Sequence, residues 1–277
     1  MSTELPVAFG GLLAYHFMVN ALLAGTLVAL MAAPIGWLMV VRRQTFAGHT
    51  LSVVAFPGAA AAALAGAPAF SGYFASCALG AVVLSGASRS GTRSLSGESA
   101  AIGVVQALAL GCGFLFVSLY HGLLTGLDSL LFGTFLGITD SQVVVLAIIA
   151  VVILAVLAAV GRPLFFSSVD EGVARAGGVP VGALGVGFLL LLGLAVAATS
   201  QITGALLVFA LLVTPAATAQ ALTTRPGVSL ALTLAIALAV TWAGLAIAYY
   251  SIYPVGFYVT SLSFALYVLA RIWRRLR

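Results

Sequence analysis

The residues best able to do chemistry lie in one short stretch around His49. Arg42 and Arg43 close a long apolar run, and His49, Thr50 and Ser52 open the next one. The imidazole nitrogen and the two weaker hydroxyl oxygens can act as ligands to a metal ion. His49 and Ser52 are three residues apart, so a helix would place them on one face.

Two interpretations of His49 follow from its position at the start of an apolar run. An ionisable side chain in a lipid-embedded helix is costly to bury, which favours a ligand or gate in a transport pathway. The alternative is a polar residue at a helix end, hydrogen-bonded to a loop carbonyl.

Pro57 and Gly58 then interrupt the same run, and Pro215 interrupts a later one. Each proline is either a helix break or a simple kink. A break frees a backbone carbonyl, which either lines a cavity or is satisfied by a neighbouring helix.

The composition places the chain in a lipid bilayer. Hydrophobic residues make up 63% of the sequence and charged residues 6%, whereas a soluble domain carries about 25% charged residues. So few charges cannot solvate a water-facing surface. The 31 glycines fit helices that pack closely in a membrane, where small residues let backbones approach.

The basic residues argue against nucleic acid as a partner and against nucleotide binding by this chain. All eleven are arginines beside apolar runs: Arg42, Arg43, Arg89, Arg93, Arg162, Arg175, Arg225, Arg271, Arg274, Arg275 and Arg277. Charges placed in this way are typical of cytoplasmic loops and not of a binding patch. Because the sequence has no lysine, it cannot form a P-loop. If ATP drives the protein, a separate chain must bind it.

Hydrophobic run lengths predict an all-α bundle of eight or nine membrane spans with short loops. The runs are 17–41, 50–68, 71–87, 99–120, 141–161, 181–199, 202–222, 228–250 and 257–271. The pair 50–68 and 71–87 is short and interrupted by glycine and proline, so one of its members is a candidate half-helix.

The arginines also predict the orientation. With nine spans and the N-terminus outside, every arginine lies at a cytoplasmic end, and the C-terminus is cytoplasmic. The predicted external connections carry none: 69–71, 121–140, 199–202 and 250–257. In the second of these connections, His121 and Asp128 either contact a delivery protein, capture a cation early, or belong to a solvated loop.

The predicted cytoplasmic connection 162–180 contains a short helix. Ser168 or Asp170 can cap it, and Asp170 and Glu171 suit its positive N-terminal end. The residues that would stop it are Gly177, Gly178 and Pro180. Such a helix, surrounded by spans, is either a docking site for a partner protein or a plain linker.

Several motifs together resemble the permease subunits of the zinc/manganese ABC importers, the ABC-3 metal permeases. They cover about residues 15–271. The matching positions are Phe46, Gly48, Leu51, Ser52, Pro57 and Gly58; the stretch 131–134; residues 170–180; residues 201–208 and 211–219; and Pro254 with Gly256. In that family the segment like 170–180 docks the ATPase, which gives Asp170, Glu171, Ala174, Arg175 and Gly178 a coupling role.

The resemblance implies a type II ABC-importer-like fold and a transport subunit that is not itself an enzyme. Residues 1–277 would form one transmembrane permease domain in the bacterial inner membrane. Two copies would line the pathway, and two cytoplasmic ATPase chains would drive it. An extracytoplasmic binding protein would deliver a divalent cation, zinc or manganese, as cargo; no resident cofactor is implied.

The chain departs from the family at the cation ligands. Where the family has an aspartate and a histidine, this sequence has His49 and Val53. One imidazole with the oxygen of Ser52 suits Zn²⁺ better than the harder Mn²⁺. Loss of the pair would also be natural in a permease for a metal chelate or another small cargo.

Two rival classes are weaker. A secondary transporter usually carries a carboxylate well inside a span, and none is found there. An intramembrane protease could use Ser52 with His49, but the Gly-x-Ser-x-Gly turn that exposes a catalytic serine is missing from the sequence.

Overall fold

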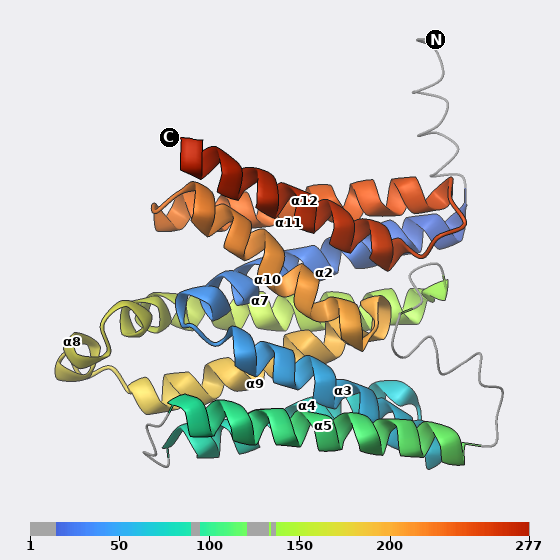
Figure 1. Ribbon diagram of the computed structural model, residues 1–277, viewed down its shortest axis with the longest axis horizontal. Coiled ribbons are helices and arrows are strands. Elements are labelled where there is room, and N and C mark those ends of the chain that lie inside the picture. Colours follow the sequence, from blue (N-terminus) through green and yellow to red (C-terminus); the bar gives the residue numbers. More distant parts are fainter. Residues whose placement is uncertain (1–14, 90–94, 121–132, 134–136, 277) are drawn as a thin grey trace, which may run out of the picture. The chain divides into compact units, whose positions relative to one another are not determined.

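The computed structural model describes residues 15–89, 95–120, 133 and 137–276, and their secondary structure is helical (Figure 1). The elements are α2 (His16–Val41), α3 (Thr45–Leu64), α4 (Ala69–Arg89), α5 (Leu95–Leu119), α7 (Asp140–Val169), α8 (Glu171–Ala176), α9 (Val181–Thr203), α10 (Ala205–Leu222), α11 (Pro226–Tyr249) and α12 (Val255–Leu276).

The helix lengths confirm an all-helical protein with many membrane spans. Among the described residues, seven helices are long and apolar enough to cross a bilayer. Two further apolar helices are shorter, Gly103–Leu119 and Leu207–Leu222. Each of the nine predicted runs overlaps one of these nine helices, as expected when every backbone polar group in lipid must find a partner within its own segment.

The predicted helix breaks at the prolines are wrong. Helix α3 continues through Pro57 and Gly58, and α10 continues through Pro215. Helix α3 is therefore a full span and not a half-helix. A proline removes one bond of the helical ladder, here to the carbonyl of Val53 or of Leu211, but packing in a membrane bundle allows the helix to continue.

The chain divides into two compact units. One contains Met1–Trp37, Thr134–Val151 and Ala210–Arg277, and the other contains Leu38–Gly133 and Val152–Phe209.

In the second unit, α3 packs against α4, α5 and α9, and α4 also packs against α9. Helices α3 and α4 meet at a pair of glycines: a Cβ on Gly72 would overlap the carbonyl oxygen of Gly58. Likewise, a Cβ on Gly193 of α9 would lie 3.0 Å from the carbonyl oxygen of Cys77. Small residues thus bring these backbones together, as is common where helices associate in lipid.

Glycines also allow close helix contacts in the first unit. A Cβ on Gly36 of α2 would overlap the carbonyl oxygen of Leu212 in α10, and one on Gly244 of α11 would lie 2.6 Å from Cγ2 of Val259 in α12. The indole N–H of Trp37 donates to Ser229 Oγ at 3.0 Å, which adds a buried polar contact between α2 and α11.

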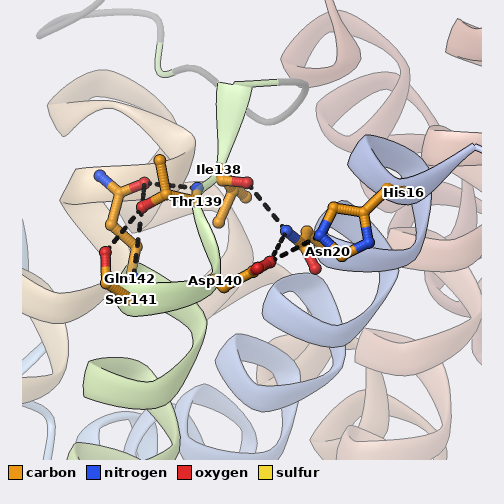
Figure 2. A network of polar contacts seen from close by, with 7 residues as sticks. All are labelled: His16, Asn20, Ile138, Thr139, Asp140, Ser141 and Gln142. Carbon is orange, nitrogen blue, oxygen red and sulfur yellow. Dashed lines mark hydrogen bonds and ion pairs between the residues drawn. The ribbon is translucent and has the colours of Figure 1, made fainter.

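A polar network in the first unit joins the N-terminal ends of α2 and α7 (Figure 2). His16 Nε2 lies 2.8 Å from Asp140 Oδ1. The amide of Asn20, one turn further along α2, donates to the same oxygen at 2.6 Å and to the carbonyl of Ile138 at 3.2 Å. His16, the first residue of α2, therefore contacts α7.

A capping box starts α7 beside this network (Figure 2). The amide N–H of Gln142 donates to Thr139 Oγ1 at 3.4 Å, and the amide N–H of Thr139 donates to Gln142 Oε1 at 3.0 Å. These reciprocal bonds satisfy two N–H groups that a helix start otherwise leaves unpaired. Asp140, in the first turn, also suits the positive end of the helix dipole.

Adding one methyl group at Gly72 should weaken the α3–α4 contact. Gly72→Ala forces the two backbones apart, at a cost of about 1–3 kcal/mol or more. In the same helix a Cβ on Gly86 meets no atom within 4 Å, so Gly86→Ala should be neutral or slightly stabilising. Thermal unfolding in detergent measures both variants, and equal midpoints for the two would contradict this packing.

Candidate functional site

His49 lies in the second turn of α3, and its imidazole is half-buried. Its Nδ1 atom is buried and has no hydrogen-bond partner among the described residues. The imidazole ring and the Phe209 ring have their centroids 4.9 Å apart and are tilted by 58°. The bond to a loop carbonyl that would make His49 purely structural is therefore not made by Nδ1. Within the described ranges, a buried nitrogen that can bind a metal is thus left without a hydrogen-bond partner.

The two hydroxyl groups beside His49 donate hydrogen bonds to backbone carbonyls of their own helix. Ser52 is buried, and its Oγ donates to the carbonyl of His49 at 2.8 Å. Thr50 Oγ1 donates to the carbonyl of Phe46 and accepts the amide of Gln106 from α5, both at 2.9 Å. Thr50 thus links two helices, whereas Ser52 keeps an acceptor lone pair one turn from His49.

The described residues contain no group of three or more His, Cys, Asp or Glu side chains placed to hold a metal ion. Val53, one turn beyond His49, is buried and adds no ligand atom. A closed structural metal site needs about four such ligands. Among the described residues, the surroundings of His49 therefore do not form a closed structural metal site.

Gln201, near the end of α9, is a candidate that the sequence prediction missed. Its side-chain Nε2 is buried and has no hydrogen-bond partner among the described residues. The signal in the sequence was weak: one amide side chain at the edge of a long apolar run. Gln201 belongs to the same compact unit as His49.

Two of the sequence motifs meet where α9 ends. Gly204 and Gly133 both adopt positive φ, 75° and 80°, a region that other residues rarely enter. A Cβ on Gly133 would overlap the carbonyl oxygen of Ile202 and lie 2.6 Å from the amide nitrogen of Gly204. The glycine of the 131–134 motif is therefore required by the turn that follows Gln201. The other residues of that motif, and His121 and Asp128, lie outside the described residues.

The short helix predicted in 162–180 is confirmed as α8. Asp170 caps it, because Asp170 Oδ1 accepts the amide N–H of Val173 at 2.9 Å. Ser168, the other predicted cap, instead lies in the last turn of α7. An i,i+4 ion pair joins Glu171 Oε1 to Arg175 Nη2 at 2.5 Å with both side chains exposed, so it adds little stability.

The C-terminal end of α8 is equally well defined. The amide of Gly178 donates to the carbonyl of Arg175 at 3.1 Å, and that of Val179 donates to Ala174 at 3.0 Å. Gly178 has φ +80°, so the arrangement is a Schellman cap that needs glycine at this position. Ala174 is fully buried and faces the protein, while the charged side chains of Glu171 and Arg175 face outward.

Together these features describe a polytopic helical membrane protein with a capped, charged helix between two spans. Residues 14–274 match the model of the ABC 3 transport family. The chain belongs to this family.

Named relatives agree with the family match. The chain is 32% identical over 232 residues to the manganese transport system membrane protein MntC of Halalkalibacterium halodurans, which covers 83% of this chain and 78% of the relative. It is 32% identical to the chelated iron transport system membrane protein YfeC of Yersinia pestis, over 80% and 74% of the two chains.

A solved structure shows the same fold. PsaBC from Streptococcus pneumoniae in complex with Fab has a TM-score of 0.84 to this chain at 24% identity, over 96% of this chain and 95% of the other.

Removal of the cap at Asp170 should loosen α8. Asp170→Ala loses the bond to the Val173 amide, at a cost of about 1 kcal/mol, whereas Asp170→Asn keeps a side-chain oxygen that caps equally well. Hydrogen exchange of the amides of residues 171–176 should accelerate in the alanine variant only. Equal rates in the alanine variant and the wild type would show that Asp170 does not hold α8.

Proposed function

We propose that this chain is the membrane-spanning permease subunit of an ATP-driven importer for a divalent metal ion. The observation that carries the proposal is the family match over residues 14–274, together with relatives named for manganese transport. The number of spans fits a permease. Membership of the family also disfavours the ion-coupled secondary transporter that the sequence left open.

His49 is the proposed cation ligand in the pathway. Its buried Nδ1 has no hydrogen-bond partner in the part of the chain that the structure describes, so the cost of burying it is offset when an ion passes. Ser52 is the proposed supporting oxygen ligand. Because one chain offers so few ligands, a second copy bringing its own His49 to the pathway would strengthen the site.

Two kinds of cargo are candidates, a free cation and a metal chelate. Relatives named for manganese favour the free cation Mn²⁺, whereas a lone imidazole favours Zn²⁺. A relative named for chelated iron supports a metal chelate as the second candidate. A chelate brings its own ligands, so it would tolerate Val53 where the family has histidine.

Helix α8 is the proposed contact for a separate ATPase chain. It is held at both ends by side-chain and backbone caps, and its outward face carries Glu171 and Arg175. A rigid, charged and exposed helix between two spans can transmit a displacement caused by a partner protein to those spans. The sequence lacks the lysine of a P-loop, which fits an ATPase on another chain.

The rest of the assembly follows from the same proposal. Residues 1–277 form one permease domain in the bacterial inner membrane, with the C-terminus cytoplasmic. An extracytoplasmic metal-binding protein loads the opposite face. Pro57, Gly58 and Pro215 lie within helices that line the pathway, where each proline leaves a backbone carbonyl without its helical N–H.

His49→Ala should abolish most cation uptake. Loss of a ligand contributing about 1.4 kcal/mol lowers uptake about tenfold. Radioactive manganese and zinc uptake into vesicles that contain the chain with its ATPase measures the effect. His16→Ala removes another histidine outside the proposed pathway and should leave uptake near wild type. The assignment of His49 fails if the two variants transport alike.

Charge reversal on α8 should uncouple the ATPase. Glu171→Arg places a second cation one turn from Arg175, so it destroys the ion pair and alters the docking face. We expect ATP hydrolysis to continue while cation uptake falls. The matched control is Glu171→Gln, which removes charge without reversing it and should have the smaller effect. Normal ATP use per transported cation in the reversal variant would contradict docking at α8.

A further inference from the structure

Arg42 is a cation at the junction of three helices in the second unit. It directly follows the last residue of α2 and lies three positions before the first residue of α3. Its guanidinium reaches the C-terminal end of α7, where Nη1 donates to Ser168 Oγ at 2.9 Å. Longer contacts of 3.5 Å join the same nitrogen to the carbonyl of Leu164 and to Ser167 Oγ. Arg42 therefore binds the last turn of the helix that leads into α8.

The same side chain also contacts the helix that leaves α8. Its Cζ lies 5.3 Å from the centroid of the Phe188 ring in α9, and Phe188 is almost completely buried. This is the geometry of a cation–π contact, which strengthens when the cation is partly removed from water. Arg42 thus joins the two spans that flank α8 in the chain.

A third contact leads to the helix that carries His49. Arg42 Nε donates to Gln44 Oε1 at 3.2 Å, and Gln44 is the residue that immediately precedes α3. His49 follows five positions later. The connection between Val41 and Thr45 is short, so a displacement of Arg42 moves the start of α3 with it.

The electrostatic environment agrees with a partly buried cation that is restrained by its contacts. Burial lowers the pKa of the Arg42 guanidinium below its usual value, and the carboxylate of Glu171 in α8 opposes that shift. An arginine stays protonated in proteins, so the positive charge remains and is stabilised by its neighbours. Neighbouring Arg43 is exposed and takes a positive φ of 57° in the turn, which makes it a natural control.

We propose that Arg42 is a positioning residue that transmits movement of α8 to α3 and so to His49. It does not touch the cargo. It ties the end of α7, the start of α9 and the start of α3 into one cluster, so that these elements move together when a partner displaces α8. This inference rests on the proposed function, in which α8 contacts an ATPase and His49 contacts the cation.

The test compares Arg42→Gln with Arg43→Gln in the chain reconstituted in liposomes with its ATPase and binding protein. The readout is the ATP hydrolysed per manganese ion transported. We expect Arg42→Gln to raise this ratio about fivefold, the lower end of usual coupling between sites, and Arg43→Gln to leave it unchanged. Arg42→Lys should restore it only in part, because an ammonium cannot reproduce the planar fork of donors.

A second readout distinguishes loss of transmission from α8 to α3 from loss of ATPase docking and from misfolding of the variant. Hydrogen exchange is measured with and without the ATPase. In the wild type the ATPase should change exchange in both α8 and the first turn of α3, and in Arg42→Gln it should change α8 alone. Ser168→Ala, which removes the 2.9 Å contact without changing charge, should act in the same direction.

Each outcome decides one claim. A wild-type coupling ratio in Arg42→Gln, or an equal rise in Arg43→Gln, overturns the role of Arg42. A response of α3 that persists in Arg42→Gln overturns it as well, even where uptake is too weak to measure. Absence of ATP-dependent uptake in the wild type would instead contradict the proposed function.

Discussion

The constraint on which the structure depends is that a polar atom buried in a membrane protein must find a partner. An unpaired one costs about 1–3 kcal/mol. The backbone meets this need by forming helices, and buried hydroxyls meet it by donating to the carbonyl four residues earlier. Examples are Thr199, Ser200, Thr203, Thr233 and Thr241. Among the described residues the buried side-chain atoms without a partner are His49 Nδ1, Gln201 Nε2 and Ser263 Oγ. In a transport protein, such exceptions are where a cargo can supply the missing contact.

The proposed contact with the ATPase lies in a different part of the same unit. Helix α8 is capped at both ends, and in the proposed function it would move as a rigid unit and displace the spans on either side. Arg42 binds both of those spans and the residue before α3. A charge held by so many contacts is expensive to separate from them. In the proposed function, the site with few ligands at His49 and the junction held by several contacts at Arg42 are complementary, because the cargo must leave easily while coupling must be maintained.

Much of the fold could be predicted because lipid imposes it. Apolar run lengths located the seven long and two shorter apolar helices of the described residues, and Asp170 with the glycines after it located α8. The helix breaks at Pro57 and Pro215 could not be judged from sequence, because packing by neighbouring helices decides whether a proline ends a helix. The buried amide of Gln201 and the contacts of Arg42 were not predicted for a related reason: an amide and an arginine at the ends of apolar runs look alike whether they face water or a packed junction. His49 was found because histidine is rare in such runs, while its environment had to come from the structure.

Metal binding by His49 is the property on which the proposed cation pathway depends most directly. X-ray absorption at the zinc edge, on purified protein loaded with zinc, reports the atoms around the ion. We predict nitrogen scattering at about 2.0–2.1 Å, the distance of an imidazole ligand, and its loss in His49→Ala while bound zinc falls. An unchanged spectrum with unchanged zinc content in that variant would contradict a cation pathway through His49.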